Sequence, residues 1–160
     1  IHGELPEHLQ PKVFWVLIGT NDFGHGDCSP DMVVAGILRV VDELRTRRPD
    51  SVVVINSLLP RRDRQAVTEV IFDGNNSNIF SIWNSIKIVN EKLRNYCEEE
   101  QKKNLGNKVM YFDATDIFLS TNKDGMDYIV AELMPDFLHP NGNGYYAWAK
   151  RITATLHTIP

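Results

Sequence analysis

The chain has 160 residues, of which 42% are hydrophobic and 24% are charged, as in a globular protein of one domain with its own core. The net charge of −4 argues against a nucleic-acid-binding surface. No run reaches the ~18 apolar residues that a membrane-spanning helix needs. Two small arginine groups, at 45–48 and 61–64, are expected on solvated helix ends or loops.

Cysteine usage and the first residue bear on the compartment. Cys28 and Cys97 are too few for a disulfide framework. A pair of thiols suits a reducing environment, which slightly favours the cytoplasm over secretion but leaves the compartment unknown. Because the chain starts at Ile1 rather than Met, we expect upstream sequence, including any signal peptide, to lie outside it.

Three short apolar runs, at 13–18, 52–55 and 109–112, predict buried strands. The runs are continuous rather than alternating, which is typical of a parallel sheet covered on both faces. Helical patterns lie between and after them, from Ser29-Pro30-Asp31 to near Pro49, over about 79–103, and after Asn141. The last helix offers four core candidates: Tyr145, Trp148, Ile152 and Leu156. This alternation predicts an α/β doubly wound fold, whose sites form beyond the carboxyl ends of the strands.

Two segments, 60–78 and 115–135, are long for loops and are candidates for lids over a site. We expect a short helix at 126–134 in the second of them.

Two polar clusters carry the chemistry that the sequence suggests. Gly19-Thr20-Asn21-Asp22 follows the first predicted strand, and Asp136 stands three residues before His139. A histidine is a suitable general base, and a nearby carboxylate can hold its ring. An Asn side chain at the rim of a sheet can donate to an oxyanion. We therefore expect Asn21 and His139 to face one cleft at the carboxyl end of the sheet.

These clusters resemble two conserved blocks of the SGNH (GDSL-type) hydrolases. Gly19-Thr20-Asn21-Asp22 is similar to the third block of that family, and Asp136-x-x-His139 is similar to the fifth. With Leu58-Leu59-Pro60-Arg61 after the second strand, the pattern most resembles the catalytic subunits of the intracellular platelet-activating-factor acetylhydrolases. The resemblance extends from about residue 3 to about residue 156.

The resemblance implies a three-layer α/β/α flavodoxin-like sandwich that lacks its first strands. Residues 1–160 would form a single SGNH-hydrolase-like domain, incomplete at its N-terminus. The three predicted strands would be the third, fourth and fifth of five. The Gly-Asp-Ser block with the nucleophile, and the glycine block of the oxyanion hole, would both lie upstream of Ile1. A sheet without its central strand leaves an edge open, so the chain should be poorly stable by itself.

The resemblance also implies a serine esterase or acetylhydrolase that needs no metal and no organic cofactor. His139 would be the base, Asp136 its orienting carboxylate and Asn21 an oxyanion-hole donor. Gly19 would let the backbone bend, and Asp22 would serve as a structural partner for loop amides. The substrate would be a small ester, with O-acetylated lipids and sugars as candidates, and the oligomeric state stays open.

Several alternatives remain at this point. A metal site could use Asp22, His25, Asp27 and His139, but their spacing matches no known site. Ser57 lacks the Gly-x-Ser-x-Gly elbow of an exposed nucleophile, and Cys28, beside a helix start, has no evident base. A catalytically inactive binding or scaffold protein of the same fold is the competing function. A nucleotide binder is disfavoured because no Gly-rich phosphate loop follows a strand.

Overall fold

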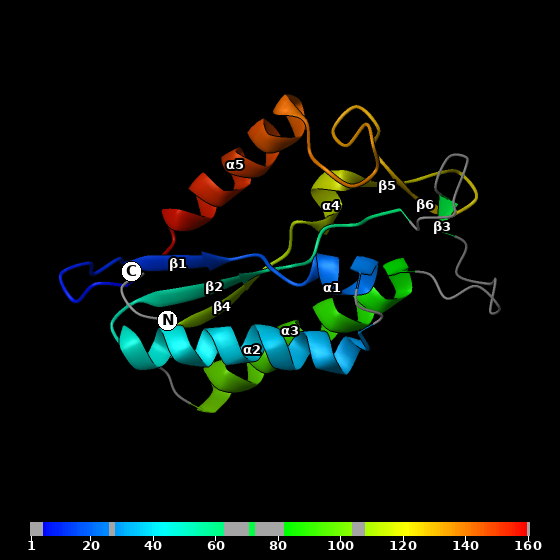
Figure 1. The fold of residues 1–160 in the computed structure, drawn as a ribbon. Helices are drawn as coiled ribbons and strands as arrows, with labels where there is room; N and C mark the ends of the chain where they lie inside the picture. Colours follow the sequence, from blue (N-terminus) through cyan, green and yellow to red (C-terminus); the bar gives the residue numbers. More distant parts are fainter. Residues whose placement is uncertain (1–4, 26–27, 63–70, 73–81, 104–107, 160) are drawn as a thin grey trace.

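Three parallel strands form the central sheet of the computed structural model, which describes residues 5–25, 28–62, 71–72, 82–103 and 108–159. The strands are β1 (Val13–Val16), β2 (Val52–Asn56) and β4 (Val109–Phe112), and they lie in the order β1-β2-β4 (Figure 1). Val13 pairs with Val52, and Val53 pairs with Val109. The central strand β2 is buried along its whole length, as its unbroken apolar run predicts. The predicted α/β fold with a parallel sheet is confirmed.

Helices cover both faces of this sheet. Helices α2 (Pro30–Arg47) and α3 (Ile82–Lys103) pack on one face, and α5 (Gly142–Leu156) lies on the other (Figure 1). Alternate residues of β2 divide between the layers, because Val53 and Ile55 join the α2–α3 core whereas Val52 and Val54 join the core under α5. The predicted helix start at Ser29 is confirmed, since its side chain accepts a hydrogen bond from the Met32 amide. Residues 79–81 of the second predicted helix lie outside the described residues.

Fewer residues of α5 pack against the sheet than the sequence of this helix predicts. Trp148 and Ile152 are half-buried and pack toward the sheet. Tyr145 and Leu156 are exposed, so the prediction that they belong to the core is wrong. The three described strands of this sheet do not cover the full apolar stripe of the helix.

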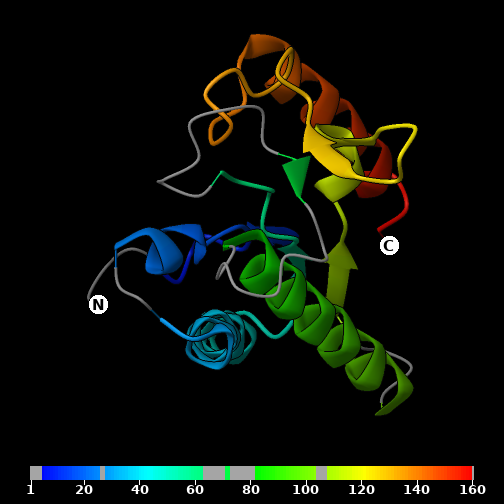
Figure 2. The same ribbon diagram turned by 90° about the vertical axis from the view of Figure 1, so that its right-hand side faces the viewer.

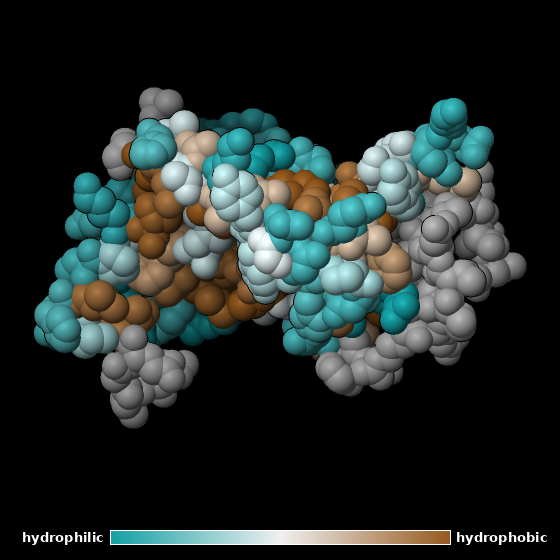
Figure 3. All heavy atoms as spheres, turned by 90° about the horizontal axis from the view of Figure 1, so that it is seen from above, coloured by the Kyte–Doolittle hydropathy of each residue, from teal (hydrophilic) through white to brown (hydrophobic). Residues whose placement is uncertain are grey.

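Strand β1 is the least protected of the three. Among the described residues it pairs only with β2, and Val13 and Trp15 are only partly buried. Figure 3, which views the α5 side, shows apolar side chains open on this face among polar ones. An edge strand beside incompletely covered apolar surface is a liability for an isolated domain. The expectation that the chain is poorly stable by itself stays a prediction.

A second, antiparallel sheet lies beyond the carboxyl end of the first. It consists of β3 (Ile71–Phe72), β6 (Asp127–Ile129) and β5 (Leu119–Thr121), in the order β3-β6-β5, and it follows the short helix α4 (Thr115–Phe118). The helix predicted at 126–134 is therefore wrong. Residues 127–129 pair with both neighbouring strands, and Ile129 is buried with Phe118 and Met134. Tertiary pairing overrides the local helical pattern here.

A buried asparagine ties α5 to the sheet. The Asn56 Oδ1 atom accepts hydrogen bonds from the indole Nε1 atoms of Trp15 (2.9 Å) and Trp148 (3.1 Å), while its Nδ2 donates to the Ser57 carbonyl (2.7 Å). One carboxamide thus joins β1, the end of β2 and α5, the helix that follows His139. This bond set fixes the helix against the sheet and so limits where His139 can lie.

Replacing Asn56 by leucine should lower the free energy of unfolding by about 2–5 kcal/mol, because two partly buried indole N–H groups lose their acceptor. Urea denaturation would measure this. The same substitution in a Trp15→Phe, Trp148→Phe background should cost clearly less, because no indole donor is left stranded. Equal costs in the two backgrounds would contradict this role for the carboxamide.

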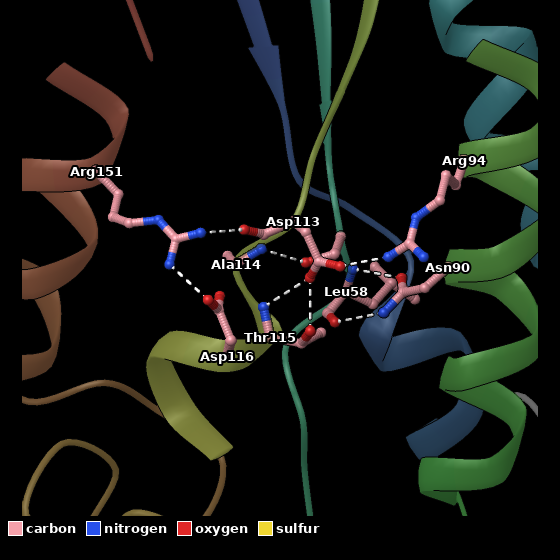
Figure 4. A network of polar contacts seen from close by, with 9 residues as sticks. Leu58, Asn90, Arg94, Asp113, Ala114, Thr115, Asp116 and Arg151 are labelled. Carbon is pink, nitrogen blue, oxygen red and sulfur yellow. Dashed lines mark hydrogen bonds and ion pairs between the residues drawn. The ribbon is translucent and has the colours of Figure 1, made fainter. Parts of the chain in front are cut away.

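A further polar network holds the carboxyl ends of β2 and β4 (Figure 4). The Asn90 side chain of α3 accepts from the Leu58 amide (2.8 Å) and donates to the Leu58 carbonyl (3.0 Å). Asp113 accepts from the Thr115 amide and forms an ion pair with Arg94. Arg151 of α5 pairs with Asp116 of α4 at 2.7 Å, and its guanidinium also reaches the Asp113 carbonyl. Helices from both layers are therefore anchored to the sheet edge at which parallel-sheet sites form.

Candidate active site

The Asp136–His139 segment folds into a tight turn that orients the histidine. Asp136 Oδ1 accepts hydrogen bonds from the amides of Leu138 (2.9 Å) and His139 (2.7 Å). Its other oxygen, Oδ2, lies 2.7 Å from His139 Nδ1. Between them, Phe137 adopts a φ of 57°, a left-handed conformation that is uncommon outside glycine. The turn is closed by a bond from the Phe137 amide to the carbonyl of the buried Met134.

The electrostatics of this turn suit an orienting carboxylate. The amide of His139, its ring and the Leu138 amide together lower the pKa of Asp136 from 3.8 to about 2, against the opposing effect of burial. An ionised Asp136 accepts the Nδ1 proton of His139, which directs the Nε2 lone pair away from the carboxylate. The His139 side chain is 72% exposed, and no hydrogen bond with the described residues engages Nε2. The ring is therefore held on one side and accessible on the other.

We expect the pKa of Asp136 to be about 2 when the ¹³C shift of its carboxyl group is followed with pH in the complete protein. His139→Ala should raise this pKa only in part, because the backbone amide of residue 139, the largest cause, remains. Since the folded pKa lies below the unfolded value, the ionised group stabilises the fold at neutral pH, and this contribution is lost as the pH falls through about 2. A wild-type value near 3.8 would contradict the hydrogen bonds of the turn.

The Gly19–Asp22 cluster lies at the end of β1, but in a different local structure from the one predicted. The strand ends at Val16, and Thr20–His25 forms a short helix, α1, so Asn21 lies in a helical turn. Gly19 makes this turn possible with a φ of 107°. A Cβ atom at this position would lie 2.9 Å from Val33 Cγ1, so a larger residue would be both strained and crowded.

The side chains of Asn21 and Asp22 are exposed. The Asn21 carboxamide makes no hydrogen bond with any described residue, so it does not act as a cap for the strand end. Asp22 contributes backbone bonds, from its amide to the Gly19 carbonyl and from the Cys28 amide to its own carbonyl. Its carboxylate has no hydrogen bond among the described residues, and its expected role toward loop amides stays a prediction.

Two consecutive arginines connect the clusters. Arg61 Nη1 donates to the Thr20 carbonyl (2.7 Å) and lies 3.4 Å from the Thr20 hydroxyl. The amide of Arg62 donates to the Phe137 carbonyl (2.9 Å). Figure 2 looks onto this edge of the sheet and shows the segment after β2 passing between α1 and the loop before α5. Thr20, which precedes Asn21, is thus bonded to the Arg61 side chain. Phe137, which follows Asp136, is bonded to the backbone amide of Arg62, the next residue along the chain.

Sequence reasoning missed this connection. The arginine groups at 45–48 and 61–64 are expected on solvated ends or loops, yet Arg48 is 8% and Arg61 6% exposed, so that expectation is wrong for both. Arg48 and Arg61 each donate to backbone carbonyls of a distant segment. The available signal is the position of Arg61 directly after Leu58-Leu59-Pro60, an apolar continuation of a buried strand.

The candidate nucleophiles Ser57 and Cys28, and the other cysteine, Cys97, are all at least partly buried. Ser57 is 0% exposed, and its hydroxyl accepts a hydrogen bond from the Ala114 amide (2.9 Å), so it cannot reach a substrate. Burial raises the pKa of Cys97 to about 12, which disfavours its thiolate. Cys28 is half-buried and packs against the core formed with α2 and α3.

The described part of the chain contains neither a metal-binding cluster nor a membrane-spanning helix. It contains no group of three His, Cys, Asp or Glu side chains arranged to hold a metal ion. Asp27 and the side chain of His25 lie outside the described residues. None of the described helices combines the length and apolar character needed to span a membrane.

Comparison with known proteins assigns the family. Residues 2–147 match the GDSL-like Lipase/Acylhydrolase family. The chain belongs to this family. The resemblance stated from the two polar clusters is thereby confirmed.

Individual relatives agree with this family membership. The chain is 29% identical over 158 residues to platelet-activating factor acetylhydrolase IB subunit alpha2 of Homo sapiens, covering 99% of this chain and 55% of the relative. It is 42% identical over 60 residues to subunit alpha1 of the same organism, covering 38% of this chain and 24% of the relative. The chain therefore spans about half the length, or less, of these two relatives.

A solved structure shows the fold of this GDSL-like chain. A carbohydrate esterase family 3 protein from Talaromyces cellulolyticus superposes with a TM-score of 0.61 at 17% identity. The match covers 95% of this chain and 60% of that protein. The SGNH-hydrolase fold predicted from the sequence is confirmed at this level.

Proposed function

We propose that this chain carries the base, the orienting carboxylate and one oxyanion donor of a serine ester hydrolase whose nucleophilic serine lies upstream of Ile1. In that enzyme the serine hydroxyl attacks the acyl carbonyl and gives its proton to His139 Nε2. His139 then protonates the leaving alcohol, while Asp136 stabilises the imidazolium. Asn21, with backbone amides of the upstream segment, donates to the oxyanion. Water releases the acid by the same steps, and no metal or organic cofactor takes part.

The arrangement of Asp136 and His139 carries this proposal. A carboxylate held by two backbone amides binds Nδ1 at 2.7 Å, and Nε2 remains accessible. A structural histidine gains nothing from such exposure, whereas a general base requires it. Family membership and the exposed carboxamide of Asn21 support the same assignment.

The proposed substrate is a small ester with a short acyl group, with an O-acetylated lipid or an O-acetylated sugar as the class. This proposal is supported by the names of similar proteins, which include an acetylhydrolase and a carbohydrate esterase. The alternative is a catalytically inactive binding or scaffold protein of the same fold.

Hydrolysis of p-nitrophenyl acetate by two proteins tests the proposal. Residues 1–160 alone should have no measurable activity, because the nucleophile and half of the oxyanion hole are absent. A longer protein that includes the upstream segment should hydrolyse the ester. Activity of residues 1–160 that disappears in His139→Ala would overturn the placement of the serine, and a folded but inactive longer protein would favour the scaffold alternative.

A further inference from the structure

We propose that Arg61 is a positioning residue that sets the oxyanion donor Asn21 relative to the base His139. This inference rests on the proposed function and adds to it a residue that touches neither the substrate nor the reacting atoms. It follows from three features of the structure: a fixed anchor after β2, a charged hydrogen bond from that anchor to the Asn21 turn, and a backbone bond from it to the His139 turn.

The anchor is the segment that follows β2. The Asn90 carboxamide accepts a hydrogen bond from the Leu58 amide and donates one to the Leu58 carbonyl (Figure 4). The Ser57 amide donates to the Phe112 carbonyl (2.9 Å), and its hydroxyl accepts from the Ala114 amide. Ser57, Leu58 and Arg61 are all buried. A segment bonded to both β4 and α3 in this way has few alternative positions.

From this anchor, the Arg61 guanidinium reaches the Thr20 carbonyl at 2.7 Å. That carbonyl belongs to the same planar peptide unit as the Asn21 amide nitrogen. A charged donor in a buried setting makes a stronger hydrogen bond than a neutral one. Because α1 has only six residues and begins directly after Gly19, whose φ is 107°, this bond restrains the orientation from which the Asn21 carboxamide projects.

On the other side, the next residue restrains the His139 turn. The Arg62 amide donates to the Phe137 carbonyl at 2.9 Å, and the Arg62 guanidinium lies 5.7 Å from the centre of the Phe137 ring. Phe137 is the residue held in the left-handed conformation. The Asn21 turn is thus bonded to Arg61, and the His139 turn is bonded to Arg62, within one anchored segment. A substitution at Arg61 should therefore move Asn21 and leave His139 in place.

The test is a double-mutant cycle in the complete protein, with kcat and KM for p-nitrophenyl acetate and the melting temperature measured for each variant. Arg61→Met should lower kcat by roughly 10–100-fold with KM changed by less than about twofold, because misplacing a transition-state donor costs rate rather than binding. In an Asn21→Ala background the same substitution should cost less than about threefold, since the donor it positions is already gone. Arg61→Lys, which keeps the charge and a donor, should recover part of kcat.

Arg48 provides a matched control at the opposite end of β2. It is also a buried arginine whose guanidinium donates to backbone carbonyls, those of Leu5, Pro6 and Leu9 among them. Arg48→Met should lower the melting temperature as Arg61→Met does, yet leave kcat within about twofold. If Arg61→Met does not fold, Arg61→Lys replaces it in the cycle.

The possible results distinguish a failure of the Arg61 positioning role from a failure of the proposed hydrolase function. An enzyme that requires His139 but keeps its kcat in the Arg61 variants overturns the positioning role alone. The same holds if the Arg61 and Asn21 effects multiply in full, because Arg61 then acts independently of Asn21. A complete protein that hydrolyses the ester equally well as His139→Ala overturns the proposed function and the role of Arg61 with it.

Discussion

Replacing His139 by alanine in a protein that contains the complete domain should lower kcat for p-nitrophenyl acetate by at least about 10³-fold. The imidazole would act only in the transition states, where it accepts and returns the proton, so KM should change little. Its ring is held by Asp136 on one side and the side chain is largely exposed, so the substitution should leave the fold intact. Steady-state kinetics together with a melting curve would check both parts.

His157→Ala is the matched control for this prediction. His157 is also exposed, at the carboxyl end of α5, and its side chain has no hydrogen bond among the described residues. The control should retain full activity. A His139→Ala enzyme within about tenfold of the wild-type kcat would remove His139 from the chemistry and leave it a surface residue.

The second large effect is expected for Asn21→Ala, which should lower kcat by about 10²–10³-fold with little change in KM, as is typical when an oxyanion donor is lost. The carboxamide makes no hydrogen bond with the described part of the protein, so its removal should leave stability nearly unchanged. Kinetics and thermal unfolding of the same preparation would measure both.

The Asn21→Asp variant tests whether the N–H donor of the side chain, rather than its size, is needed for the reaction. It keeps the size but replaces the donor by a negative acceptor, so it should be at least as inactive as Asn21→Ala. An unchanged kcat in either variant would remove Asn21 from the oxyanion hole. A large loss of stability in Asn21→Ala would instead indicate a structural role for the α1 turn.

The parts of the fold that were predictable are those in which local pattern and tertiary environment agree. The run 52–55 is apolar throughout, which agrees with the burial of β2 on both faces of the sheet. Ser29 and Pro30 begin α2 through a cap and a fixed φ, both of which are local effects. The Asp136–His139 pair was predictable for the same reason, since its geometry is contained within four residues.

The parts that could not be predicted depend on contacts between distant segments. The burial of Arg61 results from its bond to Thr20, 41 positions earlier, and no local signal specifies that partner. Residues 127–129 form a strand because two other strands pair with them. The left-handed conformation of Phe137 is held by bonds to Met134 and Arg62, and a bulky aromatic residue gives no hint of it in sequence.

The most direct test of the central claim is to identify the nucleophile. The complete protein would be reacted with a serine-directed fluorophosphonate, digested, and mapped by mass spectrometry. We predict a single modified serine in the segment upstream of Ile1, greatly reduced labelling in His139→Ala, and no modification of residues 1–160 produced alone. A modified residue within 1–160, or an active protein that the reagent leaves unmodified, would contradict the proposed enzyme.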